Sequence, residues 1–218
     1  MATPRTTKPD EPILYFADLR AWLKWLKRHH ATSGAIWLRI AKRGGPPSVT
    51  YAEAVEGGLI WGWIDSQKAA LDDTAWLQRF TRRTSKSPWS RINREKAEKL
   101  LTAGRLEAPG RAAIEEARAD GRWDRAYPGA RSAEVPADLS QALSRIPRAK
   151  RFFEGLDGAN RFAILVRLHN LKTAKGRENA IQRYVDMCSR GETIHAPRGS
   201  APNRQSSVRS KTKSSKNR

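Results

Sequence analysis

The sequence lacks several features that would indicate a compartment directly. Only one of its 218 residues, Cys188, is a cysteine, so no disulfide forms within the chain and nothing points to an oxidising compartment. No apolar run approaches the roughly 18 residues of a membrane-spanning helix, and the start MATPRTTKPDEP has no apolar stretch typical of a secretion signal. These absences predict a cytoplasmic protein without a membrane span.

Motifs for nucleotide, metal or nucleophilic chemistry are also missing. No glycine pattern of the Walker or dinucleotide-binding type follows an expected strand, and no G-x-S-x-G turn occurs. The four histidines, at positions 29, 30, 169 and 195, lack partner cysteines and the short spacings of a zinc site. Cys188 falls on an apolar helical stripe, which predicts a buried thiol. We therefore expect no metal and no cofactor, and we favour a protein that is not an enzyme.

Charge, by contrast, is abundant and mostly positive. The chain has 42 lysines and arginines against 22 acidic residues, a formal net charge of +20. Residues 197–218 hold seven basic residues and no acid, and residues 1–12 are balanced, which leaves +13 on the body. Such a charge raises the non-specific affinity for nucleic acid, anionic lipid or acidic protein. The basic tail is thus a candidate for non-specific contact with nucleic acid.

The spacing of apolar residues predicts an α+β fold. Periods of 3.6 and of two mark helices and strands in the first half: residues 18–30 and 50–62 as helices, and 35–42, 63–69 and 75–82 as strands. Asp18 and the pair Thr50 and Glu53 are suited to cap the two helices. We expect a small antiparallel sheet of about three strands, packed with helices.

The remainder predicts helices only. A helix is expected from the first turn at Ser87 and Pro88, and another from Pro109. After a linker near residues 127–136, four more helices are expected: 137–144, 147–155, 159–170 and 174–190. The resulting organisation has four parts: a disordered leader at 1–12, a mixed α+β domain at 13–131, an all-helical C-terminal module at 132–196 and a disordered basic tail at 197–218.

The segment Leu59 to Asn93 is the best candidate for a site. It holds four of the eight tryptophans together with acidic, arginine and amide side chains. If Asp65 and Arg79 lie across a hairpin they can pair, and a carboxylate beside a guanidinium with aromatic walls makes a polar pocket. The predicted ligand-binding residues, for an unknown small ligand or protein, are Trp63, Asp65, Arg79, Trp89 and Asn93. The alternatives are an aromatic core with a structural ion pair, or an enzyme with Asp65 as acid or base.

The C-terminal helices admit a second function. Basic residues flank two successive helices, with a spacing that loosely allows a helix-turn-helix that binds nucleic acid. These residues are Arg161, Arg167, Lys172, Lys175, Arg177 and Arg183. The alternative is a solvated, basic surface of a helical bundle.

Several short motifs resemble those of a known family. The pieces are Trp61-Gly62-Trp63-Ile64-Asp65, Gln78-Arg79-Phe80-Thr81, Ser87-Pro88-Trp89-Ser90 with Asn93, Gly121-Arg122-Trp123, Ala159-Asn160-Arg161-Phe162-Ala163-Ile164-Leu165 and Arg190-Gly191-Glu192-Thr193-Ile194-His195. Together they resemble the YdeI or OmpD-associated family, also called bacteriocin-protection proteins, over about residues 16–195. Arg82 stands where the family pattern has proline, and Pro88 where a polar residue is usual. Both departures affect the loop that leaves the candidate site.

The resemblance implies a role rather than a reaction. The family name suggests tolerance to bacteriocins or cationic antimicrobial peptides, and it supplies no catalytic residue or cofactor. A protein of net charge +20 repels cationic peptides. The resemblance therefore implies a binding or stress-tolerance protein that acts indirectly.

Overall fold

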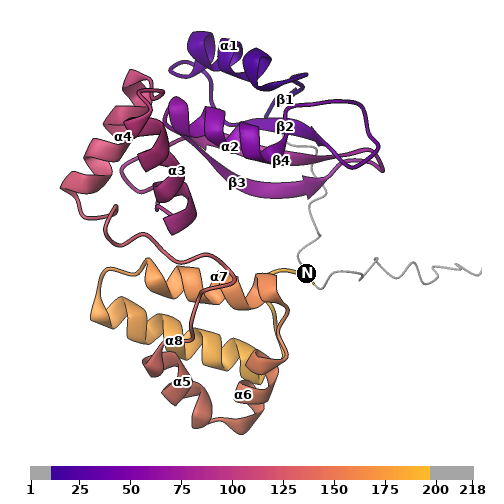
Figure 1. Ribbon diagram of the computed structural model, residues 1–218. Coiled ribbons are helices and arrows are strands. Elements are labelled where there is room, and N and C mark those ends of the chain that lie inside the picture. Colours follow the sequence, from indigo (N-terminus) through magenta and orange to yellow (C-terminus); the bar gives the residue numbers. More distant parts are fainter. Residues whose placement is uncertain (1–10, 197–218) are drawn as a thin grey trace, which may run out of the picture. The chain divides into compact units, whose positions relative to one another are not determined.

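A computed structural model describes residues 11–196 of the chain and shows an α+β fold (Figure 1). The chain divides into two compact units between Ala133 and Glu134. Within the described residues, the first unit contains all the strands and the second contains only helices. This confirms the predicted fold class. Most of the predicted leader and the whole basic tail, residues 1–10 and 197–218, lie outside the described residues.

The sheet has four strands in the order β1-β2-β4-β3. They are β1 (Ile13–Leu14), β2 (Ile36–Ala41), β3 (Trp63–Ala70) and β4 (Ala75–Arg82). The last three pair antiparallel, as predicted, and β1 adds a parallel pairing with β2. The sheet is therefore mixed and has one strand more than predicted, because a strand of two residues is too short to show alternation.

Two helices, α1 (Leu19–His29) and α2 (Tyr51–Ile60), begin at the predicted caps. The Asp18 carboxylate accepts from the Ala21 amide at 2.8 Å, and Thr50 and Glu53 form a complete capping box. The glycines of α2 allow close packing, because a Cβ at Gly57 would lie 2.5 Å from the Trp22 ring.

Two further helices follow the sheet, α3 (Arg91–Thr102) and α4 (Ala108–Ala119). The predicted start of α3 at Pro88 is wrong, because its cap is Ser90. The Trp89 carbonyl instead accepts from the Tyr127 amide at 2.9 Å, which keeps the chain extended just before the helix. The helix α4 approaches the end of α2 closely, and a Cβ at Gly110 would lie 2.4 Å from the Ile60 carbonyl oxygen.

Aromatic rings form the centre of the core in the first unit. Trp22 and Phe80 are 0% exposed and Trp63 is 1% exposed. The ring of Trp22 meets those of Trp63 and Phe80 edge-on, at centroid distances of 6.3 and 5.8 Å. Both buried indoles also find acceptors, Ala54 O for Trp22 and His30 O for Trp63. These rings join α1 to one face of the sheet.

The second unit is a bundle of four helices among the described residues: α5 (Ala137–Ser144), α6 (Pro147–Glu154), α7 (Gly158–His169) and α8 (Ala174–Ser189). All four match the predicted segments. Cys188 is 1% exposed, so the prediction of a buried thiol is confirmed. Asn160 is also buried, and its amide both accepts from His195 N at 2.8 Å and donates to His195 O at 3.2 Å. This exchange holds the segment after α8 against α7.

Gly110→Ala should destabilise the first unit by about 1–3 kcal/mol, because the added methyl group meets backbone rather than a movable side chain. Thermal or urea unfolding measures the change. Gly34→Ala is the matched control, since no atom lies within 4 Å of a Cβ there. Equal stability of the two variants would contradict the close approach of α4 to α2.

Candidate functional site

The predicted pairing of Asp65 with Arg79 is wrong. In the register of β3 and β4, Asp65 lies opposite Phe80, so it shares the face of the sheet that carries Phe80. Arg79 is the next residue along β4 and points to the other face. There its Nε and Nη2 each donate to the Glu11 carboxylate at 2.6 Å. This ion pair lowers the pKa of Glu11 and raises that of Arg79.

Trp63 also takes a structural position. Its ring is 1% exposed within the aromatic core, and its Nε1 donates to the His30 carbonyl. Two of the five residues predicted to bind a ligand, Trp63 and Arg79, are therefore already engaged inside the first unit. Of the other three, Asp65 and Trp89 lie near Arg83, a residue that was not among the predicted ligand-binding residues.

Arg83 stacks on Trp89, with its guanidinium carbon 3.6 Å from the ring centroid. Its Nη1 donates to Pro88 O at 3.1 Å. Its Nε and Nη2 are buried and have no hydrogen-bond partner among the described residues. Burial lowers the pKa of Arg83 to about 9, although the nearby Tyr127 and Asp65 act in the opposite direction. Arg83 is therefore still charged at pH 7, with two donors unused.

The unused donors of Arg83 are chemically specific. Nε and Nη2 form the edge of a guanidinium that binds a carboxylate or phosphate through two parallel hydrogen bonds. Arg79 holds Glu11 by this edge, and Arg177 holds Asp138 by the same edge at 2.5 and 2.9 Å. The Nε and Nη2 edge of Arg83 is thus the donor pair with which Arg79 and Arg177 bind carboxylates. Among the described residues, no carboxylate accepts from this edge of Arg83.

Two tyrosines, Tyr51 and Tyr127, lie near the Asp65 carboxylate. The Tyr51 hydroxyl donates to Asp65 Oδ2 at 2.7 Å, and burial together with the Asp65 charge raises the pKa of Tyr51. Burial, followed by the Asp65 charge, also raises the pKa of Tyr127, against the effects of Arg83 and of a hydrogen bond with Ser90. We call Tyr51, Asp65, Arg83, Trp89, Ser90 and Tyr127 the Arg83 cluster. Asn93 lies in the first turn of α3, where its backbone N–H donates to the capping Ser90 Oγ at 3.1 Å.

The loop between β4 and α3 is fixed by a distant residue, Arg122. Its side chain is 8% exposed, and its Nη1 donates to Thr84 O at 3.2 Å and to Ser87 O at 2.9 Å. Nearby, the Trp123 ring meets Trp89 at 4.8 Å between centroids. Arg122 and Trp123 therefore hold the loop on which Arg83 and Trp89 stand. The motifs Gly121-Arg122-Trp123 and Ser87-Pro88-Trp89-Ser90 are visible in the sequence, but the contact between them is not.

In the second unit the six predicted basic residues differ in their surroundings. Arg177 donates to both carboxylate oxygens of Asp138. Lys175 pairs with Glu178 at 3.0 Å, and the Arg161 guanidinium carbon lies 5.5 Å from the Phe153 ring centroid. The other three, Arg167, Lys172 and Arg183, are exposed and make no ion pair within the described residues. Arg167 lies on α7, Lys172 in the turn between α7 and α8, and Arg183 on α8.

Residues 11–196 contain neither a candidate metal cluster nor a candidate membrane span. There, no group of three or more histidine, cysteine, aspartate or glutamate side chains is arranged to hold a metal ion. No helix in this range has both the length and the apolar character needed to cross a bilayer.

The fold and the Arg83 cluster define an α+β protein with a helical C-terminal unit and a buried, incompletely paired arginine in its first unit. Residues 132–191, in that helical unit, match the family described as bacteriocin-protection, YdeI or OmpD-associated. Residues 14–113 match a separate model, a domain of unknown function called DUF8412. The resemblance seen in the sequence is confirmed for the C-terminal unit. Comparisons with curated proteins and with solved structures find no match.

Asp138→Asn should lower the stability of the second unit by about 1 kcal/mol at pH 7, since the pair with Arg177 is partly exposed. Arg177 lowers the folded-state pKa of Asp138, so the stabilisation is present above the unfolded value near 4 and is lost as the pH falls through the folded value. Urea unfolding of both proteins should therefore converge in acid. A difference that persists at pH 2 would contradict this ion pair.

Proposed function

We propose that the first unit is a binding module for a ligand with a carboxylate or phosphate group, which completes the free edge of Arg83. The observation that carries this proposal is the buried Nε and Nη2 pair without an acceptor. A buried cation with unmade hydrogen bonds is costly, and an anionic acceptor removes that cost. Perturbed titration around Arg83 is typical of functional sites and supports the same location.

The surroundings of Arg83 suit a ligand with more than one polar group. Asp65 and the Tyr51 hydroxyl offer hydrogen-bond acceptors near the guanidinium, since the single O–H of Tyr51 is already donated to Asp65, and Trp89 supplies an aromatic wall. Both free nitrogens of Arg83 are closed to solvent, so binding requires the side chains that cover them to move. In this proposal Asp65, Trp89 and Asn93 remain ligand-binding residues, whereas Trp63 and Arg79 support the fold.

The family description of the C-terminal unit suggests the process that such binding serves. Its printed name refers to bacteriocin protection. The net charge of +20 disfavours direct capture of a cationic peptide. We therefore place the protein in a binding or stress-tolerance role that protects indirectly.

Arg83→Met should abolish a stabilisation that small anions give to the wild-type protein. Thermal unfolding with inorganic phosphate and with citrate tests this, and an anion at 100 times its Kd stabilises a protein by about 2.7 kcal/mol. Arg82→Met is the control, because that neighbouring guanidinium donates to the Ala31 carbonyl instead.

Two outcomes of this experiment are decisive. Arg83→Met that folds, by circular dichroism, yet keeps the anion effect would contradict the proposal. Arg83→Lys should recover only part of the effect, because an ammonium group cannot donate two parallel bonds in a fixed plane.

A second candidate function is nucleic-acid binding by the second unit, favoured by the exposed and unpaired Arg167, Lys172 and Arg183. Arg167→Gln/Lys172→Gln/Arg183→Gln should reduce the slope of log K against log salt for duplex DNA by about 2–3. The control triple is Lys24→Gln/Lys27→Gln/Arg28→Gln on α1. Duplex affinity that vanishes at physiological salt would exclude this function.

A further inference from the structure

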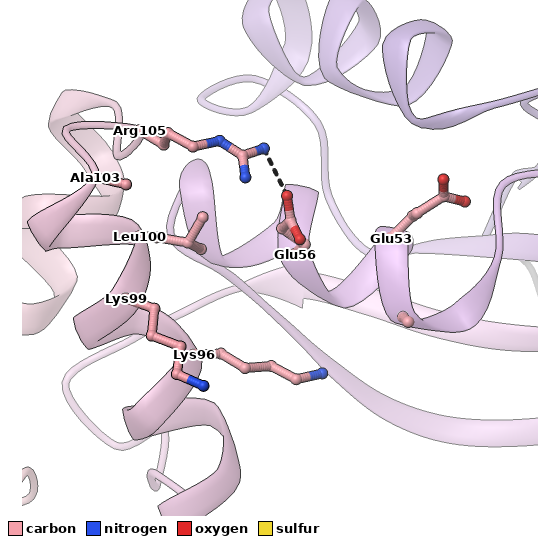
Figure 2. A pocket seen from close by; sticks show the side chains of 8 residues that line it. Glu53, Glu56, Lys96, Lys99, Leu100, Ala103 and Arg105 are labelled. Carbon is pink, nitrogen blue, oxygen red and sulfur yellow. Dashed lines mark hydrogen bonds and ion pairs between the residues drawn. The ribbon is translucent and has the colours of Figure 1, made fainter.

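A separate pocket of about 430 Å³ lies between α2 and α3 in the first unit, and its residues are distinct from those of the Arg83 cluster (Figure 2). Its exposed lining is mainly carbon, from residues such as Ala52, Leu100 and Ala103. Its polar groups are all charged. The volume falls within the roughly 300–1,000 Å³ of pockets that bind small molecules.

The acidic groups of this pocket are already engaged. Glu53 belongs to the capping box, where its Oε2 accepts from both the amide and the hydroxyl of Thr50 at 2.8 Å. Glu56 binds Arg105 at 2.6 Å, the contact drawn as a dashed line in Figure 2. Glu56 is therefore neutralised by Arg105, whereas Glu53 is held by neutral groups of Thr50 and keeps its negative charge.

The two lysines of the pocket are not engaged. Lys96 and Lys99 are three residues apart on α3, a spacing that places them on the same side of a helix. Figure 2 shows the Lys96 side chain extending from α3 into the space beside α2, and the Lys99 side chain lying along α3. Neither makes an ion pair or a hydrogen bond among residues 11–196. Three cations, Lys96, Lys99 and Arg105, thus face two carboxylates, Glu53 and Glu56, and the pocket has a net charge of +1 next to an apolar floor.

We propose that this pocket binds a small amphipathic anion. A carboxylate, sulfonate or phosphate group lies between the ammonium groups of Lys96 and Lys99, and the apolar body covers Leu100 and Ala103. Lysine ammonium groups are flexible point charges, so the pocket selects for an anion attached to an apolar body rather than for one acid geometry. This site is independent of the proposed anion site at Arg83.

The fluorescent probe 8-anilinonaphthalene-1-sulfonate tests the proposal, because it joins a sulfonate to an apolar body. The full-length protein should bind it saturably, and Lys96→Gln/Lys99→Gln should weaken binding about tenfold, as expected for the loss of two partly exposed charge contacts. The uncharged relative N-phenyl-1-naphthylamine should bind both proteins equally. Both substitutions are at partly or fully exposed lysines, so the fold should persist.

Two control pairs make the same change in net charge. Arg148→Gln/Lys150→Gln on α6 should leave the affinity for the sulfonate unchanged. Lys24→Gln/Lys27→Gln alters a neighbouring hollow beside α1, which Arg105 also lines. The proposal is overturned if this α1 pair removes binding, or if Lys96→Gln/Lys99→Gln weakens it no more than the α6 pair does. Arg83→Met should bind the probe normally, which separates this test from that of the Arg83 site.

Discussion

The first unit depends on the close contact between the Trp22 ring and Gly57 of α2. A side chain at Gly57 would overlap the indole, so only glycine lets α1 and α2 meet at this distance. The same ring packs against Trp63 and Phe80 and thereby fixes which face of the sheet is buried. Once that face is buried, the period of two along the strands determines where each polar residue points.

The site follows from this constraint. Because Phe80 faces the helices, Asp65 opposite it faces them too and meets Tyr51 of α2. Arg79 is directed to the other face, where it closes on Glu11. Asp65, which was predicted to pair with Arg79, therefore lies near Arg83 at the end of β4.

Arg83 is a buried charge that its neighbours stabilise, although its Nε and Nη2 have no hydrogen-bond partner among the described residues. Burial lowers the pKa of Arg83 although Tyr127 and Asp65 act in the opposite direction, and its guanidinium also contacts the Trp89 ring and Pro88 O. Arg122 donates hydrogen bonds to the backbone carbonyl groups of Thr84 and Ser87 in the loop around Arg83, rather than to side chains of that loop. The guanidinium is thus held in position by the folded unit itself, which would reduce the entropy lost on binding at the proposed anion site.

The sequence by itself determined the helices, three of the four strands, the caps at Asp18 and Thr50 and the buried thiol at Cys188. These depend on local periodicity and on residues three apart, which a linear pattern records. Only the tertiary structure decided the parallel strand β1, the start of α3, and the partners of Asp65, Arg79 and the loop arginine. Those depend on contacts such as Arg79 with Glu11, 68 residues apart, and Arg122 with Ser87, 35 residues apart. Position within a strand indicates which face a side chain takes, but packing chooses which face is buried and which distant charge reaches it.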